Sequence, residues 1–217
     1  MLVKDLPLEQ RQALEDLTND ISNVFKSIST DYLEQWRIDC ERGPLTDCPE
    51  SVKQVEQGSK AIGLDHLSKY IHVEPDYYDW ELQQRAVQAP SREHMCKSVV
   101  LENTRCTHSS IEGKYVKPVN TQKLLNFVRD LKNREISKKY YNFRLADSEK
   151  SLELTGYKSG GVCPVGMTQP VPIIIAKSIL NLEPPVIYLG AGHIDWKLGV
   201  PVKDFIEASG CFVADLD

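Results

Sequence analysis

The sequence predicts an α+β protein in which a mixed β-sheet follows a helical N-terminal extension. Three observations lead to this fold class. Over the first 70 residues, apolar positions recur every three or four residues, which is typical of amphipathic helices. From residue 161 onward, the apolar runs have strand length and are separated by Gly and Pro. Strands and helices are interspersed without a steady βαβ repeat, which favours a mixed or antiparallel sheet.

The first 70 residues are predicted to form three helices. Pro7 suits the first turn of a helix over residues 7–28. Within this segment, apolar residues stand three or four positions apart, at 14, 17, 21, 24 and 28. Two further helical segments run from Asp31 through Cys40 and from Pro49 to Ala61. We therefore expect an acidic helical extension over residues 1–70 and a main domain over residues 71–217.

The centre of the chain is less regular. Tyr77 to Val87 is predicted as a short helix, and residues 94–102 as a buried strand with a β-branched core. Residues 107–119 are polar and interrupted by Pro, so the next strand is expected to be short or missing. Asn120 and Asp147 are placed to cap two later helices.

The C-terminal part of the chain alternates short apolar runs with turns. One short helix, over Lys203 to Ala208, is expected there. The predicted strands are Val171 to Ala176, Val186 to Leu189, Trp196 to Val200 and Cys211 to Ala214.

Charge is unevenly distributed along the chain. Residues 1–93 carry a net charge of −8, whereas residues 114–144 carry +7 within a protein of net charge −5. A basic segment in an acidic protein is either a solvated helix face or a phosphate contact. The tRNA-contact candidates in it are Lys123, Arg129, Lys132, Lys138 and Lys139.

Location and membrane association follow from apolarity and cysteine content. No apolar run reaches the length of about 18–20 residues that a membrane span needs, so no membrane partner is expected. The six cysteines lie in a chain that shows no secretion signal, which favours reduced thiols and a cytoplasmic protein.

A glycine-rich loop at residues 159–166 is the main candidate site. It contains Gly160, Gly161, Gly166 and Pro164, and a second glycine pair follows at residues 190–193. Such a loop presents backbone N–H groups to a ligand that approaches the main chain closely. The alternative from pattern alone is a tight turn between strands.

Two side-chain sites are weaker alternatives. His94 and Cys96, with Cys106 and His108, have the ligand types of a zinc site but lack the spacing of a zinc ribbon. Cys163, paired with His193, would be a nucleophile only if a base lowered the thiol pKa, and no third partner is identifiable from spacing. We expect neither a metal nor a cofactor.

Lys97 begins an apolar strand. A lysine in such a position either reaches a pocket, where it can bind phosphate or carboxylate as a point charge, or extends outward to solvent.

Three motifs together resemble the YbaK / prolyl-tRNA synthetase editing-domain family. Residues 97–101 resemble its lysine strand, residues 160–166 its GxxxP loop, and residues 190–206 its closing G-x-G hairpin and helix. The motifs occur in the order that this family uses, and the similarity covers roughly residues 78–217. The resemblance implies a barrel-like mixed sheet and an aminoacyl-tRNA deacylase, which hydrolyses the ester of a mischarged tRNA at its 3′-terminal adenosine.

Site residues follow from the same resemblance. Lys97, Gly160, Gly161 and Pro164 are the expected catalytic positions, with Lys97 orienting the ester or contacting the tRNA terminus. The expected substrate-binding residues are Val162, Cys163, Gly166, Gly190, Gly192 and His193. Because members of the family are thought to use the substrate's own groups, no protein nucleophile is expected.

Two other functions stay open at this point. The first is a catalytically inactive module that binds tRNA or an aminoacyl-tRNA synthetase through the same fold. The second is a zinc-stabilised interaction module. The basic segment is the expected contact to the acceptor stem, and the N-terminal extension has no role that the sequence assigns.

Overall fold

The computed structural model describes residues 7–85, 89–105, 113–114 and 119–216, and the chain divides into two compact units, residues 1–39 and 40–217. The first unit contains the helix α1 (Leu8–Asp39). Two helices were predicted over this range, but the structure has one. The hydroxyl of Thr30 bonds back to the carbonyl oxygen of Lys26 (2.9 Å) within the helix, so it does not cap a new one.

The apolar stripe of α1 is exposed to solvent. Its members are Leu14, Leu17, Ile21, Val24 and Ile28, which are 40–58% exposed. Because residues 8–39 form one continuous helix, residues 31–40 cannot fold back to cover this stripe. No helix among the described residues has the length and apolarity needed to cross a membrane.

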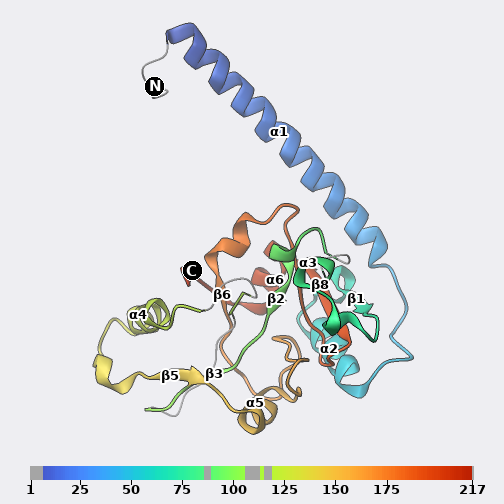
Figure 1. Ribbon diagram of the computed structural model, residues 1–217, viewed down its shortest axis with the longest axis vertical. Helices are drawn as coiled ribbons and strands as arrows, with labels where there is room; N and C mark the ends of the chain where they lie inside the picture. The colour runs from blue at the N-terminus through green and yellow to red at the C-terminus, as the bar shows by residue number, and fades with distance from the viewer. Residues whose placement is uncertain (1–6, 86–88, 106–112, 115–118, 217) are drawn as a thin grey trace. The chain divides into compact units, whose positions relative to one another are not determined.

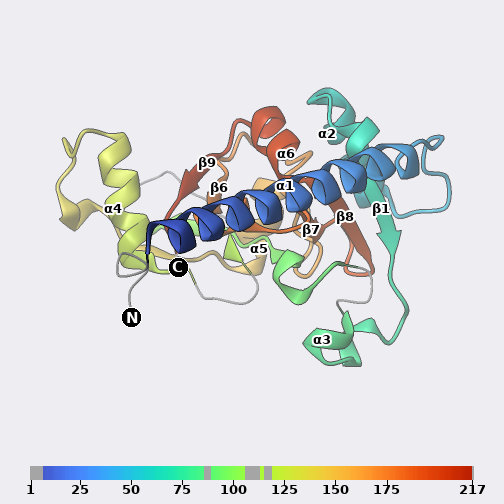
Figure 2. The same cartoon turned by 90° about the horizontal axis from the view of Figure 1, so that it is seen from above.

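The second unit contains a three-stranded antiparallel sheet (Figure 1). Its order is β1 (Lys69–His72), β8 (Trp196–Pro201), β7 (Val186–Gly190). The central strand β8 pairs Leu198 with both Tyr70 and Leu189. Figure 2 shows these strands with α6 (Val202–Ser209), which begins where β8 ends.

Three two-stranded ladders complete the described sheet structure. They are β2 (Cys96–Lys97) with β4 (Gly113–Lys114), β3 (Leu101–Asn103) with β5 (Phe143–Leu145), and the parallel pair β6 (Ile174–Ala176) with β9 (Phe212–Ala214). The mixture of helices with parallel and antiparallel strands confirms the predicted α+β class. Among the described strands no sheet closes on itself, so the barrel-like arrangement stays a prediction.

Two helices begin at the caps that the sequence predicted. The Asn120 side chain accepts hydrogen bonds from the first turn of α4 (Thr121–Leu131), and Asp147 does the same for α5 (Ser148–Thr155). Gly156 ends α5 in the left-handed conformation (φ +79°), as a C-terminal glycine is expected to do.

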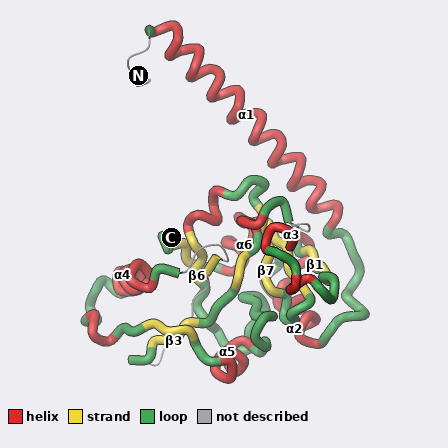
Figure 3. The backbone as a smooth tube through the Cα atoms, in the orientation of Figure 1, coloured by secondary structure: helices red, strands yellow, loops and turns green. Residues whose placement is uncertain are grey.

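The centre of the chain differs from its prediction. Residues 77–87 were expected to form one helix, but the structure has a 3₁₀ turn at Tyr77–Asp79 and a single α-turn, α3 (Leu82–Arg85). The predicted strand over residues 94–102 is divided into β2 and β3. Most of residues 107–119, where a short or missing strand was expected, lies outside the described residues. Figure 3 shows that short helices and strands in the second unit are joined by long loops.

The helix α2 (Glu50–Ala61) supports the glycine-rich loop through close backbone contact. Gln54 Nε2 donates to the carbonyl oxygen of Gly166 (2.6 Å). A Cβ on Gly58 would collide with the Cα and N atoms of Gly166. The phenol of buried Tyr157 donates to the carbonyl oxygen of Val165 (2.7 Å). The loop is therefore fixed from one side by the segment before residue 70. The division predicted at residues 70 and 71 stays a prediction.

We predict that Gly58→Ala destabilises the protein. Alanine inside a helix normally stabilises by about 1 kcal/mol relative to glycine. Here the new methyl group meets the backbone of Gly166, and overpacking of that kind costs about 1–3 kcal/mol. Urea unfolding should show a lower midpoint than wild type, whereas the control Gly43→Ala, which has open space around its Cβ position, should not. A Gly58→Ala midpoint above that of wild type would contradict the close contact.

Candidate active site

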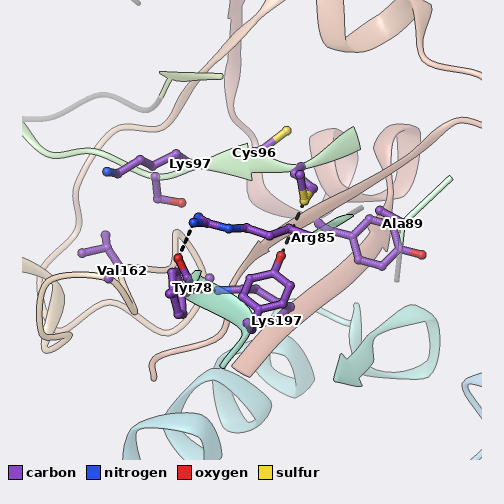
Figure 4. A pocket seen from close by; sticks show the side chains of 13 residues that line it. Tyr78, Arg85, Ala89, Cys96, Lys97, Val162 and Lys197 are labelled. Atoms are coloured by element: carbon purple, nitrogen blue, oxygen red, sulfur yellow. Dashed lines mark hydrogen bonds between the residues drawn. The ribbon is translucent and has the colours of Figure 1, made fainter. Parts of the chain in front are cut away.

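A cavity of about 290 Å³ lies in the second unit (Figure 4). Its wall comes from four parts of the chain: the turn and helix before residue 90, the strand β2, the glycine-rich loop, and the hairpin of β7 and β8. The lining residues are Tyr77, Tyr78, Arg85, Ala89, Met95, Cys96, Lys97, Ser98, Gly160, Val162, Tyr188, Gly190 and Lys197.

Lys97 and Ser98 form the β2 side of this cavity. Lys97 is exposed and lines the cavity. Ser98 is 7% exposed, and its Oγ has no hydrogen-bond partner among the described residues. A buried hydroxyl without a partner is costly, and a ligand in the cavity can supply one.

The glycine-rich loop and the hairpin meet backbone to backbone on the opposite side. The Gly192 N–H donates to the carbonyl oxygen of Gly161 (2.8 Å). A Cβ on Gly190 would lie 2.6 Å from the carbonyl oxygen of Val162, and one on Gly161 would lie 2.7 Å from the carbonyl group of Gly192. No side chain fits between these two segments, so glycine is required for their contact.

The cavity brings together only part of the predicted site. Lys97, Gly160, Val162 and Gly190 line it, as the residues of one wall or another. The other predicted positions do not belong to its described lining. They are Gly161, Cys163, Pro164, Gly166, Gly192 and His193.

Two of the residues outside the lining, Cys163 and His193, have contacts elsewhere in the structure. Cys163 is fully buried in the apolar core. Nδ1 of His193 accepts the backbone N–H of Asp195 (3.3 Å) and lies 3.6 Å from its carboxylate. Neither arrangement supplies the base that an activated thiol requires.

A cationic and aromatic wall was missed from the sequence. Lys197 Nζ lies 2.5 Å from Tyr78 Oη and 3.1 Å from the carbonyl oxygen of Ile194. Arg85 donates from Nη2 to the carbonyl oxygen of Tyr78 (2.6 Å). Lys197 Nζ lies 5.0 Å and Arg85 Cζ 5.3 Å from the centroid of the Tyr78 ring. A signal was present, because a lysine interrupts the apolar strand 196–200.

Burial, with a smaller contribution from the nearby Arg85 charge, lowers the pKa of the Lys197 ammonium to about 8, although Asp195 opposes the shift. A lysine whose pKa is lowered and which lines a cavity beside a second cation makes this wall a candidate functional site.

The predicted tRNA contacts lie on and after α4. Lys123 forms an ion pair with Asp215 (2.8 Å), and Arg129 is half-buried. Lys132, Lys138 and Lys139 are exposed. Exposed lysines are available to phosphate groups.

The zinc hypothesis falls partly outside the described residues, since Cys106 and His108 are not described. Both ring nitrogens of His94 already have partners, the Ser91 hydroxyl and the Pro184 carbonyl oxygen. Among the described residues no cluster of three metal-ligating side chains is present.

Comparison with known proteins identifies the family. The family model described as the aminoacyl-tRNA editing domain matches residues 75–208, which is more than half of the chain. The chain belongs to this family, as the motifs predicted. No curated protein matches the chain.

Solved structures have the same fold. A crystal structure of a candidate trans-editing enzyme for prolyl tRNA synthetase matches with a TM-score of 0.65 and 20% identity, over 79% of this chain and 99% of that one. A scaffold protein used for computational grafting of linear epitopes matches with a TM-score of 0.63 and 18% identity, over 78% and 98%. A hypothetical protein matches with a TM-score of 0.58 and 22% identity, over 75% and 98%.

We predict that the Cys163 thiol is protected from alkylation in the folded protein. Cys163 is fully buried, whereas Cys211 is half-buried, and reagents reach a buried thiol only when the structure opens. Peptide mass spectrometry after brief iodoacetamide treatment should show Cys211 labelled well before Cys163. Equal or faster labelling of Cys163 would mean that its thiol reaches solvent and would revive the nucleophile hypothesis.

Proposed function

We propose that this protein hydrolyses the ester between a wrong amino acid and the 3′-terminal adenosine of a tRNA. One observation carries the proposal. Lys97, the pair Gly160 and Val162, and Gly190 come from three motifs far apart in the sequence, and residues of all three motifs line one cavity. Membership of the aminoacyl-tRNA editing domain family supports the same activity.

The proposed chemistry relies on positioning and charge. An aminoacyl ester is already activated, so the enzyme needs to orient it and stabilise the oxyanion that develops at its carbonyl group. The N–H of Gly161 is engaged with the carbonyl oxygen of Lys158 (3.0 Å). The amides of Gly160 and Val162 are therefore the donors that we propose for the oxyanion, with Lys97 supplying positive charge.

The nucleophile in this proposal is not a protein side chain. A water molecule would attack the ester carbonyl with help from the neighbouring ribose hydroxyl of the substrate, and the 3′ oxygen of the adenosine would leave with a proton as the free tRNA hydroxyl. On a cysteinyl ester the substrate's own thiol would attack instead and release the same hydroxyl, leaving a cyclic thioester that water hydrolyses. Gly161 and Gly166 would act by shaping the loop, because each packs closely against backbone and neither lines the cavity. Pro164, which is buried and also outside the lining, would act in the same way.

The tRNA body would contact the basic segment. Lys132, Lys138 and Lys139 are the exposed members, and each phosphate contact makes binding more sensitive to salt. A barrel-like sheet, a cytoplasmic location and association with an aminoacyl-tRNA synthetase are parts of the same proposal.

Lys97→Ala is expected to lower the rate of deacylation at least about a hundredfold, or about 2.7 kcal/mol, on the best substrate of a mischarged tRNA panel. The physical reason is loss of the only lysine on the β2 side of the described cavity. The matched control is Lys203→Ala, since Lys203 is exposed on α6, and it should retain the wild-type rate.

A wild-type rate no greater than that of Lys97→Ala on every substrate would contradict the enzyme proposal. If the wild type still bound tRNA or a synthetase under those conditions, the inactive binding module would replace it.

Cys163→Ala is expected to lower the deacylation rate less than about tenfold, or about 1.4 kcal/mol. The thiol is buried in the core, so its removal should affect packing more than chemistry. Single-turnover rates at equal amounts of folded protein provide the measurement. A loss of several orders of magnitude would show that a protein thiol takes part in the reaction.

A further inference from the structure

Arg85 and Lys197 place two positive charges side by side on one wall of the cavity. Lys197 Nζ lies 5.5 Å and the Arg85 Cζ atom 5.8 Å from the centroid of the Tyr77 ring, and they lie 5.0 and 5.3 Å from that of Tyr78. Figure 4 shows Arg85 extending through the pocket between the strand of Cys96 and Lys97 and the side chain of Tyr78.

Both cations are held in position but keep donors for a ligand. Arg85 uses Nε for the carbonyl oxygen of Trp80 (2.9 Å) and one Nη2 hydrogen for that of Tyr78. Among the described residues, three of the five guanidinium hydrogens have no acceptor. Lys197 uses two of its three ammonium hydrogens, on Tyr78 Oη and on the Ile194 carbonyl oxygen.

The described part of the cavity wall holds no acid to balance these charges. None of the described lining residues is Asp or Glu, and neither Arg85 nor Lys197 forms an ion pair within the part of the chain that the structure describes. Asp195 acts on Lys197 only from a greater distance than an ion pair. Like charges brought together in a half-buried site repel one another, and a bound anion removes that repulsion.

Ser98 provides an independent sign of a ligand. Its Oγ is buried on the cavity wall and has no hydrogen-bond partner among the described residues. A hydroxyl donates to an anionic oxygen as readily as it does to a neutral one, and the charge strengthens the bond.

We propose that Arg85 and Lys197, with the Ser98 hydroxyl, form an anion subsite that binds an anionic oxygen group of the substrate. The subsite lies in the same cavity as Lys97, so the inference rests on the proposed function and narrows its substrate class. An aminoacyl-tRNA end offers two such groups. One is a carboxylate on the side chain of the amino acid, and the other is the phosphate on the 5′ side of the terminal adenosine.

The subsite is tested by binding, with Lys197→Met as the variant and Lys197→Arg as the charge-conserving one. Lys203→Met is the surface control. The probes are stable amides of 3′-amino-3′-deoxyadenosine, measured by calorimetry. Aspartyl and asparaginyl amides are nearly equal in size and differ in side-chain charge, since a carboxylate replaces a neutral carboxamide. Alanyl amides with and without a 5′-phosphate differ only in the phosphate.

We expect Lys197→Met to weaken one anionic probe at least about fivefold while its neutral counterpart changes less than about twofold. Loss confined to the aspartyl amide identifies the side-chain carboxylate, and loss confined to the phosphorylated alanyl amide identifies the phosphate. Lys197→Arg and Lys203→Met should bind within about twofold of wild type. Equal effects on charged and neutral probes, or no effect on either, would overturn the subsite.

Affinity for the anionic probe should also fall as the pH rises through about 8, because the Lys197 ammonium loses its charge there. The groups that act on this ammonium are Arg85, Asp195 and the rings of Tyr77 and Tyr78. Lys197→Met should abolish this pH dependence, and its persistence in the variant would contradict the assignment. Because binding requires no turnover, these results are independent of whether mischarged tRNA is hydrolysed.

Discussion

The contact between the glycine-rich loop and the hairpin is the constraint on which the site depends. Gly192 donates to Gly161, and a Cβ on either Gly161 or Gly190 would collide with backbone atoms. The helix α2 fixes the other side of the loop, where the carbonyl oxygen of Gly166 accepts a hydrogen bond from Gln54. The backbone contact with the hairpin and the Gln54 hydrogen bond hold the loop on both sides, and Val162, which also packs against the core, is thereby positioned at the cavity.

In this site the backbone determines the shape of the cavity and the side chains supply its charge. The glycines set the shape of one wall, and Lys97, Arg85 and Lys197 supply the positive charge on the others. Tyr78 joins two of these cations, since its main-chain oxygen accepts from Arg85 and its phenol contacts Lys197. A site of this kind suits an ester that needs orientation and charge stabilisation more than a protein nucleophile.

Local patterns predicted much of the fold. The helix caps at Asn120 and Asp147 and the strands β7 and β8 lie where the sequence predicted them. Their positions could be predicted because capping and apolar runs of strand length depend on residues that are neighbours in the sequence. Two predictions were wrong. Residues 7–28 and 31–40 were expected to form separate helices but belong to the single helix α1, and residues 77–87 were expected to form one helix, which the structure does not have over 77–85. Thr30 is compatible with either a cap or a helix interior, and tertiary contacts of Tyr77 and Tyr78 outweigh their helical spacing.

The sequence by itself determined the α+β class, the family and two walls of the cavity, because the lysine strand and the glycine motifs are short, local patterns. Only the tertiary structure decided which residues of those motifs reach the cavity. It buried Cys163 in the core, and it placed Arg85 beside Lys197. These two cations belong to segments far apart in the chain. Their proximity depends on the packing of Tyr78 against the hairpin, which no spacing in the sequence encodes.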